Sequence, residues 1–270
     1  MTRAKLKQLG IASLYLTLIS CANIVEQQDS APVRTPDVST VPDAVPRDEP
    51  RSKYGNPAHY EVFGKRYYTL NTSQGYREKG IASWYGTKFH GKRTSSGEPY
   101  DMYAMTAAHK TLPLPSYAEV TNLSNGRKVV VKINDRGPFH DNRLIDLSYS
   151  AATKLGIIGK GTGMVEVRAI TSGESAVPVT AAAEMQQPVT TEYVGMYLQV
   201  GAFSTSSRAE QLKSKIQQQI GDAVLIMPLN KPDGNMYRVR IGPLGSVEYG
   251  DSLASRLVNL GFNDAHIVVE

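Results

Sequence analysis

The 270-residue chain contains a single cysteine, Cys21, which excludes an internal disulfide and a cysteine-cluster metal site. It also lacks a strong excess of either charge. The net charge is +5, and Lys and Arg are not gathered into the arm or stripe that nucleic-acid binding needs. No Cys/His group has metal-ligand spacing and no glycine loop of the phosphate-binding type occurs, so we expect neither a metal nor a cofactor. These absences favour a neutral or weakly acidic ligand.

The N-terminus has the layout of a secretory signal over residues 1–20. Basic residues precede an apolar run from Ile11 to Ile19, which is too short to span a bilayer. The run ends in Ser20-Cys21, which resembles a bacterial lipobox, and the resemblance implies lipidation of Cys21. Ala22, in place of Asp, resembles the signal that sends Gram-negative lipoproteins to the outer membrane, facing the periplasm. The alternative is a plain signal peptide with an incidental cysteine.

Two stretches with the composition of loops divide the remaining chain. Residues 21–53 hold five prolines and no aromatic residue, so they bury too little apolar surface to offset the entropy of ordering. Residues 171–192 contain Pro, Ala, Thr and Gln, with acids but no base. We therefore expect a disordered tether, a folded unit at 54–170, a flexible linker and a second folded unit at 193–270. The two units should fold and act independently.

The unit at 54–170 consists of short β patterns separated by turns. The expected strands are 60–63, 67–70, 82–85, 118–123, 128–134 and 164–169, and one amphipathic helix is expected at 148–155, ended by Gly156. Many short strands with one helix predict a mainly β unit that closes into a small barrel, because closure leaves no exposed sheet edge.

Six motifs follow one another in this unit. They are Gly80-Ile81-Ala82-Ser83-Trp84-Tyr85-Gly86, Arg93-Thr94-Ser95-Ser96-Gly97-Glu98, Thr106-Ala107-Ala108-His109, Val120-Thr121-Asn122-Leu123, Ile133-Asn134-Asp135-Arg136-Gly137-Pro138-Phe139 and Ile145-Asp146-Leu147-Ser148. Together they resemble the rare lipoprotein A (RlpA) family. The resemblance implies a six-stranded double-psi β-barrel. It also implies endolytic lytic transglycosylase activity on peptidoglycan strands without stem peptides, which leaves 1,6-anhydro-N-acetylmuramic acid ends.

The unit at 193–270 has a βαββαβ pattern, which makes it an α+β domain. Strands are expected at 197–203, 224–229, 236–241 and 265–269, and helices at 204–220 and 247–260. The unit resembles a SPOR domain through its 199–203 and 237–243 motifs, which implies binding of denuded peptidoglycan at the division septum through Gln199, Phe203, Tyr237 and Arg238. RNA-binding sheets share this order. However, the aromatic ribonucleoprotein signature is missing and seven bases balance seven acids, so glycan is favoured.

Cleavage of a glycosidic bond needs a carboxyl group to protonate the leaving oxygen and a group to stabilise an oxocarbenium-like transition state. A lytic transglycosylase also needs a base for the sugar's own 6-hydroxyl. Asp135 follows an apolar strand at a strand-to-turn junction, and its family position makes it the acid; a turn-capping Asp is the alternative. The resemblance adds Glu98 as a second carboxylate and His109 as an orienting group. By default, Glu98 would be interpreted as a solvated loop acid, and His109 as a partly buried histidine whose hydrogen bonds are all made.

Three further side chains have open interpretations. Trp84 and Tyr85 are candidates for stacking on sugars, although one of them is expected in the barrel core. Arg136 either holds Asp135 ionised and binds substrate or points away, because neighbours in a strand alternate faces. Asp146 is expected to cap the helix that begins at Ser148 rather than to take part in chemistry.

The sequence thus predicts an enzyme, an outer-membrane lipoprotein concentrated at the septum. Its predicted partners are denuded glycan strands, the membrane through its lipid anchor, and divisome proteins. The alternative is a non-catalytic glycan-binding or wall-loosening lipoprotein of the expansin-like kind.

Overall fold

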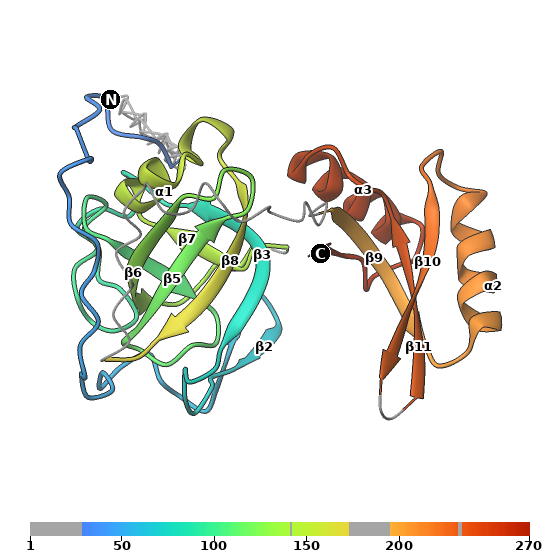
Figure 1. Cartoon of the computed structure of the whole chain (residues 1–270), viewed down its shortest axis with the longest axis horizontal. Coiled ribbons are helices and arrows are strands. Elements are labelled where there is room, and N and C mark those ends of the chain that lie inside the picture. Colours follow the sequence, from blue (N-terminus) through green and yellow to red (C-terminus); the bar gives the residue numbers. More distant parts are fainter. Residues whose placement is uncertain (1–28, 141, 173–194, 232–233) are drawn as a thin grey trace, which may run out of the picture.

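The computed structural model describes residues 29–140, 142–172, 195–231 and 234–270. The signal, the predicted lipidation site Cys21 and most of the predicted linker lie outside these residues. Figure 1 shows two units, a β-barrel and a sheet covered by helices. Within the described residues, no helix is both long enough and apolar enough to cross a membrane.

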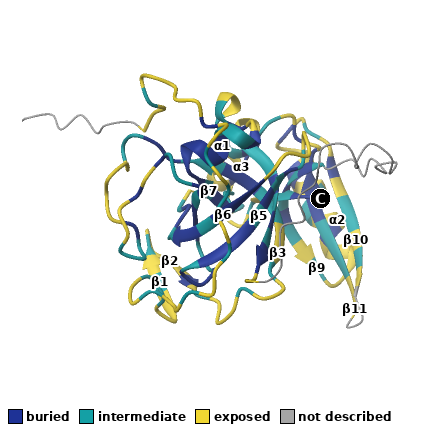
Figure 2. Ribbon diagram, turned by 60° about the vertical axis from the view of Figure 1, so that its left-hand side comes forward, coloured by how far each residue is buried: buried dark blue, intermediate teal, exposed yellow. Residues whose placement is uncertain are grey.

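Six strands close into a barrel in the order β3-β7-β4-β6-β5-β8. Their bounds are β3 Arg77–Trp84, β4 Thr106–His109, β5 Ser116–Asn122, β6 Lys128–Asp135, β7 Ile145–Leu147 and β8 Gly163–Ile170. The pairs β3–β7 and β4–β6 are parallel and the other four are antiparallel. The buried interior, dark blue in Figure 2, is filled by Val, Ile, Leu and Ala side chains of alternating strand positions. This confirms the six-stranded barrel.

The local elements of the first unit agree with the sequence patterns. Helix α1, Tyr149–Leu155, begins at Ser148, whose side chain accepts a hydrogen bond from the Ala151 amide, and it ends at Gly156 with φ 73°. A one-turn 3-10 helix, Ile158–Lys160, follows it. The hairpin of β1 His59–Val62 and β2 Lys65–Tyr68 is also present. Strands β4 and β7 were not predicted, because they are too short to show alternation.

The second unit is a four-stranded antiparallel sheet in the order β10-β11-β9-β12. Its elements are β9 Met196–Phe203, α2 Ser206–Gln217, β10 Val224–Lys231, β11 Gly234–Ile241, α3 Val247–Asn259 and β12 His266–Val269. The predicted βαββαβ order is confirmed. Both helices bury their apolar sides in the core, where Leu198, Ile216 and Leu257 are fully enclosed.

Residues 29–53, hereafter the strap, lie against the barrel (Figure 1), which differs from the disordered tether predicted for them. Val38 is 5% exposed and packs among aromatic residues outside the barrel. The Ala44 amide donates to the Val130 carbonyl at 3.0 Å, and the Val130 amide donates to Asp43 at 3.0 Å. The strap cannot form a core of its own, but the barrel supplies both an apolar surface and free backbone groups of β6. The composition of the strap shows only that it lacks a core of its own, and not that the barrel offers a surface to it.

The two units also contact each other, which differs from the independence predicted for them. Ile81 of β3 is 1% exposed and joins the hydrophobic cluster of the second unit. The Arg143 guanidinium lies 2.9 Å from the Asp251 carboxylate. Asn142 bonds to Asp251 and accepts a hydrogen bond from the Ile267 amide at 2.8 Å, at the outer edge of β12. The composition of residues 171–192 carries no information on how well these two surfaces match.

Candidate active site

Asp135 lies at the end of β6 and is held by three donors on one oxygen. Its Oδ1 accepts hydrogen bonds from the Ser95 amide at 2.8 Å, the Ser95 hydroxyl at 2.7 Å and the Arg136 amide at 2.7 Å. Oδ2 accepts no hydrogen bond from the described residues. Several donors on one carboxylate oxygen stabilise a negative charge. The geometry therefore suits a charged carboxylate with one free oxygen.

A second carboxyl, Asp146, faces the same side of the barrel wall. Ala108 of β4 pairs with Asp146 of β7 on one side and, after a register shift between Ala107 and Ala108, with Asp135 on the other. The shift sets Asp135 opposite Ala108, whereas strict alternation from the inward-facing Ile133 would turn it inside. Directly paired residues point to the same face of a sheet, and Ala107, the neighbour of Ala108, fills the barrel interior. The row therefore faces outward, with the two aspartates two strand spacings of about 4.8 Å apart. A Cβ added to Gly137 would lie 3.8 Å from an Asp146 oxygen, so this small residue leaves space between the carboxyls.

Asp146 is in a different environment from Asp135. Burial raises its pKa above the usual range, although a hydrogen bond from the Ser83 hydroxyl partly opposes the shift. It is therefore the carboxyl better able to keep a proton. The predicted role of Asp146 as a helix cap is wrong, because Ser148 caps α1. The sequence did contain a signal, since an acid between two apolar residues of a strand points to the face opposite theirs, and here Ile145 and Leu147 are buried in the barrel.

Glu98 is brought to the same end of β6 by the loop that carries Ser95. Its carboxylate lies 2.9 Å from Lys132 Nζ and accepts a hydrogen bond from Asn134 Nδ2 at 2.9 Å. Burial acts to raise the pKa of Glu98, but the hydrogen bonds from Asn134 and Lys132 outweigh it and hold the pKa below its usual value. Glu98 is therefore a charged side chain that contacts Asn134, the residue before Asp135.

His109 is 2% exposed and does not point toward the carboxyls. Its Nδ1 accepts hydrogen bonds from the amides of Leu112 at 3.0 Å and Thr111 at 3.2 Å. The proton is therefore on Nε2, which lies 2.9 Å from the Tyr76 hydroxyl, and that hydroxyl donates to Glu78. Burial lowers the pKa of His109 to about 3. The imidazole is a neutral, satisfied group that holds the turn after β4.

Arg136 contributes its backbone, and not its side chain, to Asp135. The guanidinium donates to the carbonyls of Gly55 at 2.8 Å, His109 at 3.0 Å and Leu112 at 2.6 Å. Burial lowers the pKa of Arg136 to about 10. The predicted substrate contact differs from this arrangement, in which the side chain ties the start of the barrel unit to the turn after β4.

The two aromatic candidates have different positions. Tyr85 is 7% exposed and stacks on Tyr100 with ring centroids 4.0 Å apart, so it is the core member that the sequence led us to expect. Trp84 is partly exposed and packs edge-on against Tyr149 at 6.0 Å. Only Trp84 retains a surface on which a sugar can stack.

The candidates in the second unit fall on two sides of its sheet. Gln199 accepts hydrogen bonds from Arg240, which is 3% exposed and lies 2.6 Å from Glu270. Arg238 also lies 2.6 Å from Glu270, so one carboxylate holds two arginines beside Gln199. Sequence reasoning missed Arg240 and Glu270.

Phe203 and Tyr237 are cross-strand neighbours that pack against the hydrophobic cluster beneath the helices. Their predicted role as glycan ligands differs from this position, where they support the sheet.

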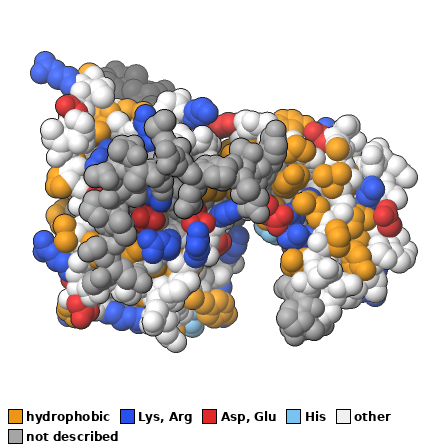
Figure 3. Space-filling view, viewed as in Figure 1, with side chains coloured by type: hydrophobic (Ala, Val, Ile, Leu, Met, Phe, Trp, Pro, Cys, Tyr) orange, Lys and Arg blue, Asp and Glu red, His pale blue; other side chains and the backbone are white. Residues whose placement is uncertain are grey.

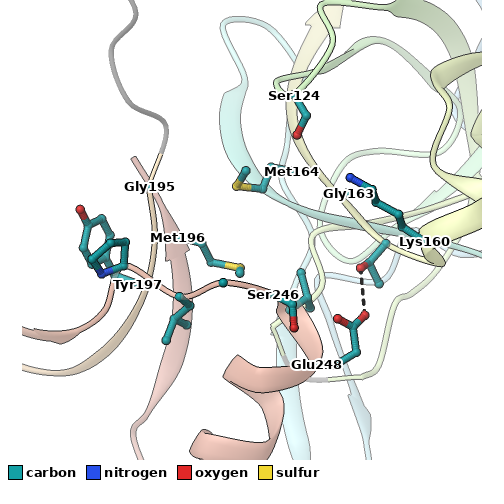
Figure 4. A pocket seen from close by; sticks show the side chains of 14 residues that line it. Ser124, Lys160, Gly163, Met164, Gly195, Met196, Tyr197, Ser246 and Glu248 are labelled. Carbon is teal, nitrogen blue, oxygen red and sulfur yellow. Dashed lines mark hydrogen bonds between the residues drawn. The ribbon is translucent and has the colours of Figure 1, made fainter. Parts of the chain in front are cut away.

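The cavity between the two units, of about 590 Å³, is separate from the carboxyl row. Figure 4 shows Met164, Met196 and Tyr197 around it. The Thr162 hydroxyl, which also lines it, lies 3.4 Å from the Glu248 carboxylate. No group of three or more potential metal ligands occurs in the part of the chain that the structure describes. Figure 3 shows Lys and Arg spread over the visible face of the barrel rather than gathered in a stripe.

Comparison with known proteins identifies both units. A family model described as lytic transglycolase matches residues 77–168, and a SPOR domain model matches residues 193–268. Proteins named endolytic peptidoglycan transglycosylase RlpA are similar over most of the chain. The one from Pseudomonas aeruginosa is 39% identical and that from Vibrio cholerae 38% identical, each over 94% of this chain, and the alignments cover 93% and 94% of their own lengths.

A crystal structure of the Pseudomonas aeruginosa RlpA SPOR domain is 31% identical, covers 27% of this chain and 97% of its own, and has a TM-score of 0.26. Two matched domains in the same order, and relatives aligned along nearly the whole length, place both units within one known architecture. The chain therefore belongs to the RlpA family.

Proposed function

We propose that this protein is an endolytic lytic transglycosylase that cleaves peptidoglycan glycan strands lacking stem peptides. The observation that carries the proposal is the outward-facing row in which Asp135 and Asp146 flank Ala108. Their surroundings differ, with three donors on Asp135 and burial around Asp146. Paired carboxyls in unlike environments are the arrangement that divides acid and charge-stabilising roles. The names of the relatives support the same reaction.

In the proposed reaction, protonated Asp146 donates its proton to the glycosidic oxygen as the bond from C1 of the muramic acid breaks. The Asp135 carboxylate stabilises the positive charge that develops on C1 and the ring oxygen. The Asp146 carboxylate then takes the proton of the 6-hydroxyl while O6 forms a bond to C1. This closes the 1,6-anhydro ring, restores the acid and consumes no water. The sequence had assigned the acid to Asp135; its three donors favour the charge-stabilising role instead.

Glu98 and His109 support this pair in different ways. Glu98 lies in the loop that carries Ser95, contacts Lys132 and Asn134 of β6, and orients the sugar at the charged end of the row. His109 is a positioning residue. Its Nδ1 holds the Leu112 amide, the Leu112 carbonyl holds Arg136, and the Arg136 amide holds Asp135. Loss of the imidazole therefore displaces Asp135 without removing a reacting group.

The remaining parts of the proposal concern location. Lipidation of Cys21 anchors the protein to the outer membrane on its periplasmic side. The sheet surface with Gln199 and Arg238 binds denuded strands and collects the protein at the septum, together with divisome proteins. The SPOR match supports this role for the second unit.

The test is product analysis by mass spectrometry after incubation of the lipid-free protein with amidase-treated and untreated sacculi. We expect 1,6-anhydro ends, and only from amidase-treated sacculi. Asp146→Asn and Asp135→Asn should each lower cleavage by at least ~10², the usual scale of acid–base and charge-stabilising groups. The control Asp101→Asn removes a carboxylate that is 56% exposed and should keep full activity. Reducing ends would indicate a hydrolase, and binding without products would favour the wall-loosening alternative.

A further inference from the structure

A cavity of about 680 Å³ lies between the strap and the strands β4, β5 and β6. Strap residues 41–45, Arg47 and Glu49 form one wall, and the other holds Thr106, Tyr117 and Lys132. The cavity exists only because the strap lies against the barrel. It is therefore a feature that no analysis of the barrel unit alone would reveal.

Two cations and two acids line this cavity, and one of the acids, Asp43, is paired with Lys154. Lys132 Nζ lies 3.1 Å from Glu49 and 2.9 Å from Glu98, and its side chain is 20% exposed. Arg47 is exposed at the wall and makes no ion pair or hydrogen bond with any described residue. The Tyr117 hydroxyl donates to Glu49. This hydrogen bond is the main reason that the pKa of Glu49 is lowered, so Glu49 is charged. A carboxylate of the strap thus already occupies a site made of Lys132, Tyr117 and the nearby Arg47.

The cavity is next to the proposed reaction centre. Thr106 lines it, and Ala108, two residues further along β4, is the middle of the carboxyl row. Two residues of a strand span about 7 Å, so the cavity and the carboxyl row are separated by a distance similar to that between neighbouring sugar units. Lys132 links the two places directly, because it also holds Glu98.

A denuded glycan strand carries a matching group. The stem peptide is joined through an amide to the lactyl carboxyl of N-acetylmuramic acid, so an intact strand is neutral there. An amidase that removes the peptide leaves a free carboxylate on each muramic acid. A cation recognises that carboxylate and gains nothing comparable from the amide.

We propose that this cavity is a subsite in which Arg47 and Lys132 bind the free lactyl carboxylate of a muramic acid next to the cleaved one, in the place that Glu49 fills when no glycan is bound. The inference rests on the proposed function. It assigns the enzyme's preference for denuded strands to named residues. The strap is then a part of the substrate site, with Glu49 as an internal competitor.

The test compares two soluble substrates of equal length, denuded strands and the same strands with their lactyl carboxyls converted to methylamides. Arg47→Gln should raise KM for denuded strands about tenfold, the scale of one charge-assisted hydrogen bond, with kcat unchanged. It should leave KM for the amidated strands as in the wild type. Glu49→Gln should lower KM for denuded strands, because it removes the competitor. Lys128→Gln, an exposed cation at the start of β6, is the matched control and should change neither KM.

Equal KM values of the wild-type protein for the two substrates would overturn the inference and leave the proposed function intact. Cleavage of neither substrate would overturn the proposed function instead. In that case the dissociation constants of the two strands are measured for the wild type and for Arg47→Gln. The C-terminal domain is identical in both proteins, so the difference reports on the cavity. An unchanged preference for the carboxylate strand would then refute the subsite.

Discussion

The buried imidazole of His109 makes the stability of the barrel depend on pH below neutrality. Its pKa is about 3 in the folded protein, and that of a histidine in an unfolded chain is about 6.5. Below about pH 6.5 the unfolded chain therefore binds a proton that the folded chain does not. The stabilisation is fully present above that value and is lost progressively as the pH falls toward the folded pKa. Between about pH 7 and pH 5 the loss is about 2 kcal/mol, from roughly 1.4 kcal/mol per pH unit.

The assay is urea unfolding of the lipid-free protein at pH 7, 6 and 5, for the wild type and for His109→Asn. The Asn side chain keeps an acceptor for the Leu112 amide but does not titrate, so the variant starts less stable and has a flatter pH dependence. The difference between the two proteins cancels the titration of every other group. It should shrink by about 2 kcal/mol between pH 7 and pH 5. A difference that stays constant over this range would falsify the neutral, buried state of His109.

Three further perturbations test other contacts. Ser95→Ala removes a hydroxyl donor from Asp135 and should lower cleavage by about tenfold with the fold intact, measured as anhydro product per unit time. Gly55→Ala should destabilise the barrel by about 1–3 kcal/mol in urea unfolding, because its φ is 78° and the new Cβ would lie 2.7 Å from the Ser95 carbonyl. Asp251→Ala leaves the Arg143 guanidinium without its partner, and it should separate the melting of the two units in calorimetry. A single unchanged transition would contradict that contact.

Periodic patterns in the sequence were sufficient to predict a strand or helix where the element is long enough to show them. β8 alternates between buried and less buried residues over 165–169, β6 carries an apolar run at 129–131, and α1 has both a capping Ser148 and a terminating Gly156. The βαββαβ order of the second unit follows from the same kind of signal. The short strands predicted a small closed barrel, and the family motifs added its six-stranded double-psi arrangement, which local periodicity does not contain.

Short strands and long-range partners were decided by the tertiary structure. β4 and β7 have four and three residues, so only their pairing within the barrel makes them strands. The strap has no core of its own and is ordered by the surface on which it lies.

At the candidate active site, the sequence alone determined that Glu98 is an acid in a loop and Asp135 an acid at a strand end, because motif and residue type are properties of the chain. It did not determine where neighbouring side chains point. The alternation of faces across β4 and β7 turns Asp146 toward Asp135, and burial encloses His109 away from both. Charge state and direction depend on which strands become neighbours and how much water they exclude. These properties arise only when segments far apart in the sequence come together.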